Sequence, residues 1–321
     1  MKVLGINWEQ NATAALVIDG EVSGCLSEER VSRSKNDERY PIHSIDWLLE
    51  RNAVGAEDLD AVVFVSTMWS PGYILTRHYT GFTVRDYIAE QYQIWKPRLL
   101  EGKDVSQLKV FSERIDYDQF PGREYWKNVV ESLDGDSAHV SSEGASEYGV
   151  KIRKEVVHRH LGLSLDKIFF ADHSLSHACY AYYLTPPKFR HGDHLVLTMD
   201  AFGDNINYSA RVFSSIGGAV TDRVICQGND FIIGRLYRYI TLILGLKPNE
   251  HEYKVMGLAP YGKPIYKDLI LEHLMDLKED GSFQMDMSYF NYCQGLTMTS
   301  AKFHEAFGGP PKAPETDVTQ R

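Results

Sequence analysis

Two histidines and an aspartate in the middle of the chain have the types and spacing that metal chemistry needs. His173 and His177 lie four positions apart in DHSLSHACYAYY, a run that favours a helix. Residues four apart share one helix face, so both imidazoles can point the same way. Asp200 follows a β-rich run at 195–199, and a carboxylate at a strand end can meet them across a cleft. Two imidazoles and one carboxylate, with coordination positions left open, suit Fe(II), Mn(II) or Zn(II).

Each part of this pattern also has an ordinary explanation. A histidine pair at this spacing is more often structural or solvated than metal-binding, and an aspartate followed by glycine can cap a turn. Gly203 and Asp204 could form a turn that brings backbone N–H groups to a phosphate, or a plain loop. Lys254, Gly257 and Gly262, in a later segment rich in glycine and proline, could do the same. The combination of all three donors is what favours a metal site.

Composition restricts the class of protein. The chain has 321 residues, of which 43% are hydrophobic and 24% charged, and its net charge is -10. This length allows two domains or two lobes of one domain. No basic cluster suited to nucleic acid is present. Four cysteines without CxxC spacing fit a reducing cytosol. Neither a signal peptide nor an apolar run of membrane-spanning length is found, so we expect a cytoplasmic protein that binds neither nucleic acid nor membrane.

Short strands and helices alternate in a way that predicts an α/β fold. Three antiparallel strands are expected at 3–6, 14–18 and 21–26, with a two-residue hairpin turn at Asp19-Gly20. The polar loop 8–12 is expected to face a ligand. A helix at 42–52 and a buried strand at 60–66 follow. Another helix at 141–161 and a strand at 167–171 lead into the histidine stretch.

Two segments lack a clear period. Residues 27–41 carry many charges, and the simplest interpretation is a solvated loop. Residues 67–130 are rich in aromatic side chains and are interpreted as an insertion, with a helix near 83–95. Aromatic density of this kind more often marks local core than a binding wall.

The second part of the chain repeats the opening theme. Strands are expected at 195–199, 207–215 and 223–227, followed by helices at 231–244 and 265–277. We therefore predict a duplicated lobe, with residues 1–190 as the first copy and 191–321 as the second. The strands at 60–66 and 167–171 of the first copy have no counterpart in the second copy. That lobe is expected to be incomplete, and the chain to be a fragment.

Several of these segments together resemble a known family. GIN, NATAAL, EERVSRSKND, HSLSHACYAYY, VLTMDAFGD and KPNEHEYKVMGLAPYG occur in this order over most of the chain. They are similar to the O-carbamoyltransferases, which include the nodulation protein NodU and enzymes of antibiotic biosynthesis. The resemblance implies an actin/sugar-kinase-like fold similar to TsaD. It also implies a separate YrdC-like domain, absent from this sequence, that makes carbamoyladenylate from carbamoyl phosphate and ATP.

The resemblance also implies roles for individual residues. His173, His177 and Asp200 take the positions of the family's iron ligands, and a further aspartate ligand lies beyond the end of this sequence. Lys35 resembles the family lysine that could contact the intermediate or the acceptor. Glu250 lies near the family's acidic residue and is the candidate base for the acceptor hydroxyl. The candidate carbamoyladenylate-binding residues, besides Lys35, are Asn11, Gly203, Asp204, Lys254 and Gly257.

One departure from the family pattern concerns proton transfer. The family has His-Asp in its first loop, where this chain has Gln10-Asn11. A glutamine cannot move a proton at neutral pH. Either Glu250 suffices, or transfer activity is altered or lost. Without the YrdC-like domain, this chain is not expected to make carbamoyladenylate itself.

The sequence thus predicts carbamoyl transfer to a hydroxyl of a small metabolite, either a sugar or a polyketide. Two alternatives remain: a sugar-kinase-like phosphotransferase, for which the histidine pair has no use, and a non-catalytic domain that binds a nucleotide or a partner. A homodimer is also considered.

Overall fold

The computed structural model describes residues 1–69, 76, 80–103, 105, 107–116, 142–229, 233–248, 250–279, 283–291 and 298–312. The chain forms two compact units: Met1–Phe82 with Asp104–Asp230, and Thr83–Lys103 with Phe231–Arg321. The predicted lobes, residues 1–190 and 191–321, are divided at a different place from these compact units. The division into lobes stays a prediction.

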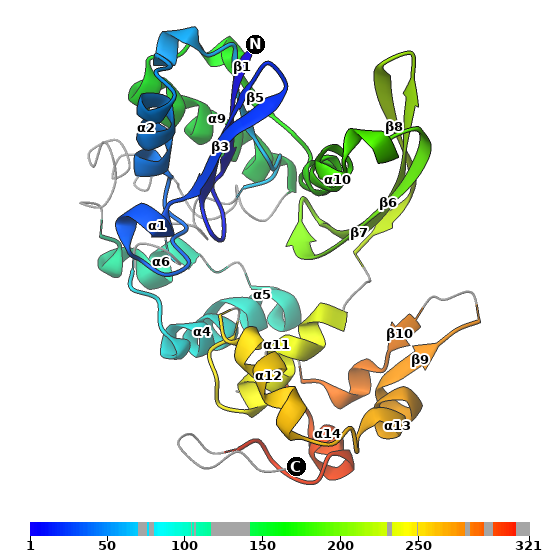
Figure 1. The fold of residues 1–321 in the computed structure, drawn as a ribbon. Helices are drawn as coiled ribbons and strands as arrows, with labels where there is room; N and C mark the ends of the chain where they lie inside the picture. Colours follow the sequence, from blue (N-terminus) through cyan, green and yellow to red (C-terminus); the bar gives the residue numbers. More distant parts are fainter. Residues whose placement is uncertain are drawn as a thin grey trace. The chain divides into compact units, whose positions relative to one another are not determined.

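The first unit is built on a five-stranded sheet with the order β3-β2-β1-β4-β5 (Figure 1). The predicted opening meander is confirmed as β1 (Lys2–Asn7), β2 (Thr13–Ile18) and β3 (Glu21–Ser27), paired antiparallel. The strands β4 (Ala61–Phe64) and β5 (Ile168–Phe170) continue the sheet in parallel pairing. The sheet is therefore mixed, as an α/β fold allows.

Tight turns set the register of the antiparallel strands. Asp19 and Gly20 both have positive φ (51° and 88°), as the predicted two-residue hairpin requires. Asp204 and Asn205 (49° and 65°) turn the chain in the same way later on, and so do Gly217 and Gly218 (60° and 86°).

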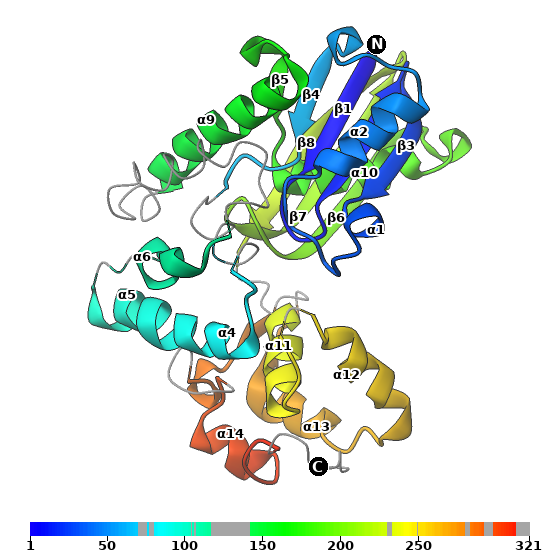
Figure 2. The same cartoon turned by 90° about the vertical axis from the view of Figure 1, so that its left-hand side faces the viewer.

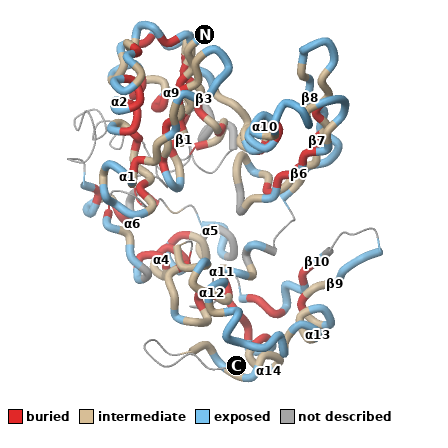
Figure 3. The backbone as a smooth tube through the Cα atoms, in the orientation of Figure 1, coloured by how far each residue is buried: buried red, intermediate tan, exposed pale blue. Residues whose placement is uncertain are grey.

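Two helices share the hydrophobic core of this sheet (Figure 2). They are α2 (Ile42–Arg51) and α9 (Ser142–Leu161). Leu4 and Ile6 of β1 are fully buried, as are Ile45 and Leu48 of α2. Buried positions gather along β1 and on one side of α2 (Figure 3). Burial of this apolar surface is the main term that holds the layer together.

A second, three-stranded sheet belongs to the same unit. The strands β6 (Gly192–Gly203), β7 (Ile206–Ile216) and β8 (Ala219–Gly228) pair antiparallel in that order. The helix α10 (His173–Leu184) packs on it through a small core of Ala178, Tyr182, Val196 and Phe213. Two antiparallel three-stranded sets thus occur in the chain, as the sequence predicts; that they are duplicated lobes stays a prediction.

The second unit is mainly helical. It contains α4 (Val84–Glu90), a π-helical turn (Gln91–Trp95), α5 (Lys96–Glu101), α11 (Ile233–Ile243), α12 (Glu252–Leu258), α13 (Lys267–Leu269) and α14 (Ala301–Ala306). A short hairpin joins β9 (Met275–Leu277) to β10 (Phe283–Met285). The helix predicted near 83–95 is confirmed, and this part of the aromatic segment belongs to the second unit. Residues 117–130 of the segment lie outside the described residues.

Three local predictions are wrong. Residues 27–41 are not simply a solvated loop, since α1 (Glu29–Ser32) lies within them and Glu28 and Asp37 are buried. The helix expected at 265–277 ends in a π-helical turn (Ile270–Leu274) and the strand β9. Gly257 lies inside α12 rather than in a turn. Among the described helices, none has the length and apolarity needed to cross a bilayer.

Candidate metal centre

Helix α10 presents two neighbouring stripes of side chains. Ser174, Ala178 and Tyr182, spaced by four, are its buried residues. The hydroxyl of Ser174 donates to Ser209 Oγ of β7 at 2.7 Å, which draws the helix close to the sheet. His173 and His177 each precede a member of this stripe by one residue, a rotation of about 100° around the helix. Packing of the first stripe therefore aims the two imidazoles along the end of β6.

An irregularity in β6 presents Asp200. Met199 pairs with Tyr208 and Gly203 with Ile206, so residues 200–202 of β6 face a single residue of β7. A bulge of this kind bends a strand and re-aims its side chains, and bulges are common beside functional sites. The strand therefore does not end at Met199, as the sequence suggests, but continues through a bulge that carries Asp200.

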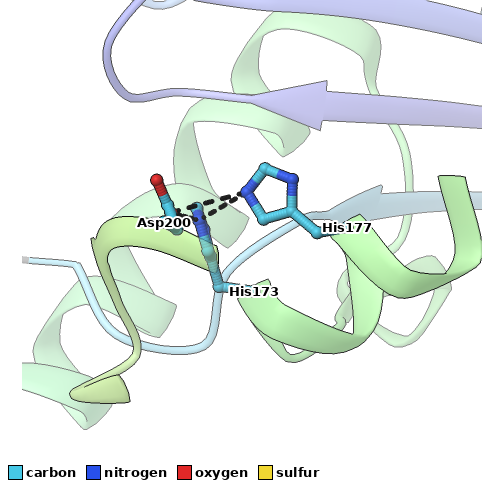
Figure 4. Close-up of side chains that lie close together, drawn as sticks. All are labelled: His173, His177 and Asp200. Carbon is cyan, nitrogen blue, oxygen red and sulfur yellow. Dashed lines mark hydrogen bonds and ion pairs between the residues drawn. The ribbon is translucent and has the colours of Figure 1, made fainter. Parts of the chain in front are cut away.

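The three donors converge on one point (Figure 4). His173 Nε2 lies 2.7 Å from Asp200 Oδ2 and 3.0 Å from His177 Nε2. His177 Nε2 lies 3.5 Å from the same carboxylate oxygen. Ligand atoms bonded at about 2.1 Å to one first-row metal ion are separated by roughly 3.0–3.4 Å. The donor types suit a divalent cation, and the separations of 3.0 and 3.5 Å lie in or next to this range. The 2.7 Å separation is that of a hydrogen bond, and a bound cation would have to widen it slightly.

The site is open on one side. The His177 side chain is 52% exposed and that of His173 only 14% exposed. One ligand is therefore fixed by its surroundings while the other faces solvent. A cation held by these three side chains would keep coordination positions for another molecule.

Gly203 makes room for the imidazole of His173. A Cβ built on Gly203 would lie 2.1 Å from Cδ2 and 2.6 Å from Nε2 of that ring. No side chain fits at such distances. The backbone of β6 thus forms one wall of the site, and Gly203 is part of that wall. Its role in binding carbamoyladenylate stays a prediction.

Asp204, in the turn between β6 and β7, supports the site through hydrogen bonds to its carboxylate. Its carboxylate accepts the backbone N–H groups of Thr67 at 2.9 Å, Met68 at 2.7 Å and His173 at 2.8 Å. The last of these is an otherwise unpaired donor at a helix N-terminus, where a negative charge is favourable. Asp172 caps the same helix locally by accepting from Leu175 N at 2.7 Å. Asp204 therefore joins the segment after β4 to α10, and its role in substrate binding stays a prediction.

A buried arginine fixes the segment that Asp204 holds. Arg153 of α9 is 1% exposed and donates to the carbonyl groups of Ser66 at 2.8 Å and Thr67 at 2.9 Å. Its guanidinium lies 4.4 Å from the centre of the Phe170 ring. Burial lowers the pKa of Arg153 to about 10, so the group is still charged near neutral pH. The five-stranded sheet and α10 are thus linked through ordered polar contacts.

Glu9 is a site residue that the sequence analysis missed. Its Oε2 lies 3.8 Å from Nδ1 of His173, on the side of the ring away from Asp200. Burial raises the pKa of Glu9, against the opposing effects of His173 and a hydrogen bond with Ser66. For His173, burial alone would lower the pKa, but the hydrogen bond to Asp200 and the charge of Glu9 outweigh it and raise the pKa. The only signal for Glu9 in the sequence is its place in the polar loop 8–12.

Two other predicted binding residues in the first unit lie on exposed loops. Asn11 is exposed, has φ of 58° and accepts the hydroxyl hydrogen bond of Thr13 through its carbonyl. Lys35 is 77% exposed and lies 3.2 Å from the carboxylate of Glu29. Both are accessible to a ligand. Their roles stay predictions.

The remaining candidates lie in the second unit. Glu250 forms an ion pair with Lys247, so the candidate base already has a cationic partner. Lys254 lies in α12, with its ammonium group 5.9 Å from the centre of the Tyr253 ring. Gly257 is in the last turn of the same helix, and a Cβ added there would meet no atom within 4 Å. The helix therefore gives Gly257 no close-approach role of the kind seen at Gly203.

Comparison with known protein families gives one match over nearly the whole chain. The family described as Carbamoyltransferase N-terminus matches residues 2–318.

Curated relatives include an uncharacterized protein of Synechocystis, sll1178, 31% identical over 99% of this chain and 44% of its own length. The nodulation protein NolNO of Sinorhizobium fredii is 24% identical over 86% of this chain and 31% of its own. An uncharacterized protein of Methanocaldococcus jannaschii, MJ1051, is 24% identical over 90% and 39%. The chain spans less than half the length of these relatives.

Solved structures give only a weak likeness. Two structures from Pseudomonas aeruginosa are similar, one of YeaZ and one of an uncharacterized protein with similarity to peptidase YEAZ. Each shares 8% identity and covers 70% of this chain and 66% of its own, with TM-scores of 0.29 and 0.30. Likeness at this level is too low to support an argument about the site.

Proposed function

Because the chain belongs to the carbamoyltransferase N-terminus family, we propose that it carries the transfer site of an O-carbamoyltransferase. The observation that supports this most directly is the convergence of His173, His177 and Asp200, whose donor atoms lie 2.7–3.5 Å apart. Carbamoyladenylate is the proposed donor, and a hydroxyl of a small metabolite, a sugar or a polyketide, is the proposed acceptor. The actin-like, TsaD-like lobes expected from the sequence form part of this proposal.

The proposed reaction is a displacement at the carbamoyl carbon. The acceptor oxygen forms a bond to this carbon, and the bond from the carbon to the phosphate oxygen breaks. AMP leaves with the electron pair of that bond, and the hydroxyl proton passes to a base. Because the mixed anhydride is already activated, the protein has to place the hydroxyl, stabilise negative charge and exclude water.

His173, His177 and Asp200 would hold a divalent cation, for which Fe²⁺ is the first candidate. A cation in this position supplies a Lewis acid for the developing charge on the donor oxygens. Gly203 and Asp204 keep the ligand set in place: the glycine leaves space for the His173 ring, and the aspartate holds the first N–H of α10.

Lys35 and Asn11 are proposed to contact the donor or acceptor, since both side chains are exposed. Glu250 is proposed as the base, and its ion pair with Lys247 has to open before it accepts a proton. Lys254 and Gly257 are proposed to contact the donor from α12. Formation of carbamoyladenylate from carbamoyl phosphate and ATP belongs, in this proposal, to a YrdC-like domain.

Transfer from supplied carbamoyladenylate to a panel of hydroxylated acceptors tests the proposal. The protein is loaded with Fe²⁺ without oxygen, and carbamoylated products are detected by mass spectrometry. We expect product from at least one sugar or polyketide acceptor. Loss of roughly 100-fold or more is expected in the His173→Ala/His177→Ala double variant, because the charge-stabilising group is then missing.

The matched control is His191→Ala, which removes an exposed histidine that is not part of the ligand set. It should transfer at the wild-type rate. Equal transfer by the double variant and the wild type would show that the three-residue site has no part in the reaction. Absence of product from every acceptor with metal-loaded wild type would refute the proposed activity.

A further inference from the structure

His173 Nδ1 is buried and has no hydrogen-bond partner among the described residues. The other ring nitrogen, Nε2, is the one that faces Asp200 and His177. Buried polar atoms are nearly always satisfied, so each exception needs an explanation.

The chemistry of a ligating imidazole supplies an explanation. When a neutral imidazole binds a cation through Nε2, its proton must reside on Nδ1. That N–H then needs an acceptor, and ligating histidines almost always donate it to a carboxylate, a carbonyl group or water. Such an acceptor fixes the tautomer and the ring orientation and makes Nε2 a better donor to the metal.

Glu9 is a carboxylate in the right place to be this acceptor. Its Oε2 lies 3.8 Å from His173 Nδ1, too far for a hydrogen bond but close enough for a side-chain rotation to form one. The Glu9 side chain is 29% exposed, so it is largely shielded from competing water.

The surroundings of Glu9 limit how far it can move. The preceding residue, Trp8, is buried, and its carbonyl accepts the indole N–H of Trp69 at 3.0 Å. The Ser66 side chain lies close enough to the Glu9 carboxylate to lower its pKa, against the effect of burial. Ser66 in turn accepts from the buried guanidinium of Arg153, at 2.8 Å through its carbonyl and 3.2 Å through its hydroxyl. Glu9 is therefore attached to the core of the five-stranded sheet.

We propose that Glu9 is a positioning residue of the metal centre: it accepts the Nδ1–H of His173 when Nε2 binds a divalent cation. This inference rests on the metal site of the proposed function. It extends that site from α10 and β6 to the loop after β1. It also assigns a role to the first loop of this chain, in which Glu9 directly precedes Gln10-Asn11.

Cation affinity is the first test, with Zn²⁺ alone as the probe. Isothermal titration with a competing chelator compares wild type, Glu9→Ala and Glu9→Gln. We expect Glu9→Ala to raise the Kd for Zn²⁺ by about 10- to 100-fold, the usual effect of removing such a partner. Glu9→Gln should recover much of the affinity, because its amide oxygen can still accept from Nδ1–H.

A matched control separates this effect from a general loss of negative charge. Glu155→Ala removes a carboxylate of α9 that is paired with Arg159 at 3.0 Å and belongs to no part of the ligand set. Its Zn²⁺ affinity should equal that of wild type. Circular dichroism of the metal-free proteins verifies that each variant is folded.

A spectroscopic readout separates positioning from a merely structural role. In the Co²⁺-loaded protein, the ring N–H protons of the ligating histidines are shifted by the metal and become visible by proton NMR. We expect the His173 N–H to exchange slowly with water in wild type and Glu9→Gln. In Glu9→Ala it should exchange much faster, while the N–H of His177, which is 52% exposed, is unchanged.

The outcomes are distinguishable. If wild type binds neither Zn²⁺ nor Co²⁺, the metal centre and the proposed function are both refuted, and this inference with them. If wild type binds and Glu9→Ala binds equally well with an unchanged His173 N–H, only the role of Glu9 is overturned. If Glu9→Ala does not fold, the His173 N–H of Glu9→Gln decides: fast exchange there contradicts the hydrogen bond.

Discussion

Gly203 leaves the space that the His173 ring, one of the candidate ligands, occupies. The backbone of β6 passes so close to the His173 imidazole that any Cβ at this position would overlap the ring, at 2.1 Å from Cδ2. The ring has little room to retreat, because Asp200 and the end of β6 lie against it. A single methyl group should therefore disturb the metal centre more than it disturbs the fold.

The first prediction concerns Gly203→Ala. Relief of the overlap must move the His173 ring, so we expect the Kd for Zn²⁺ to rise at least about 10-fold. The strain should lower the free energy of unfolding by about 1–3 kcal/mol. Titration calorimetry and urea denaturation measure the two effects. Gly5→Ala is the control, since its Cβ would meet its closest neighbour at an ordinary 3.7 Å; an equal loss of affinity in both variants would contradict the explanation.

At the scale of elements, the segment between β3 and α2 is held by buried carboxylates. Glu28 accepts the N–H and the hydroxyl of Ser44 at 2.9 and 2.7 Å. Asp37 accepts from Arg39 Nε at 2.8 Å and Ser32 Oγ at 2.5 Å, and its carbonyl accepts from Ala12 N at 2.7 Å. The charged run that looked solvated in the sequence is thus an ordered support for the loop after β1.

This gives a prediction for the pH dependence of stability. Burial alone would raise the pKa of Asp37, but hydrogen bonds from Arg39 and Ser32 outweigh it and hold the pKa below its ordinary value of 3.8. A carboxyl with a depressed pKa stabilises the fold at pH values above its unfolded pKa. This contribution is lost as the pH falls through the lower, folded pKa.

Urea denaturation between pH 7 and pH 2.5 measures the effect. We expect Asp37→Asn to be less stable than wild type by about 1–3 kcal/mol at pH 7. The difference should shrink below about pH 4, where the Asp37 carboxyl of the unfolded wild type, and at lower pH that of the folded wild type, takes up a proton. Asp193→Asn, at an exposed carboxylate, is the control for general effects of charge. A constant gap between Asp37→Asn and wild type over the whole range would be inconsistent with this role.

Local sequence patterns predicted the elements well and the contacts between them poorly. The strands of the opening meander, the hairpin turn at Asp19-Gly20 and the helix that bears the histidines follow from periodicity and turn chemistry, which are local. The bulge at 200–202 and the close approach at Gly203 depend on how β6 meets α10. Asp204 reaches Thr67 across 137 positions of the chain. Glu9 has no local signal beyond its place in the polar loop 8–12, because its importance comes from the His173 ring beside it.

Residue types alone do not distinguish the two glycines Gly203 and Gly257. Gly203 and Gly257 look alike in sequence, because each lies in a segment suited to a turn. In the structure, Gly203 is required by its contact with His173, whereas Gly257 continues a helix with open space around it. The difference is tertiary, so no pattern within either segment could separate them.

For the whole molecule, the division into two compact units predicts which part should become more stable when a cation binds. All three candidate ligands belong to the first unit, on α10 and β6. A ligand that binds only the folded state stabilises it by mass action, by about 2.7 kcal/mol at a free concentration 100-fold above Kd. We expect Zn²⁺ to slow amide hydrogen exchange in α10 and in the β6–β7 hairpin.

Hydrogen exchange followed by mass spectrometry, with and without Zn²⁺, makes this comparison. The amides of α11 and α12, in the second unit, should change much less. The His173→Ala/His177→Ala double variant should show no difference on addition of Zn²⁺. Slower exchange in α11 and α12 alone would place the cation elsewhere.

The end of the β6–β7 hairpin restricts where the chain can accept insertions and deletions. Asp200 in the bulge, Gly203 against the His173 ring and Asp204 at the turn are fixed by one stretch of backbone. An insertion or deletion between Asp200 and Asp204 would put at least one of them out of place. The connection 185–191 between α10 and β6 carries none of these contacts. Natural or engineered length changes should therefore be accepted in that connection and rejected within the five residues of the hairpin end.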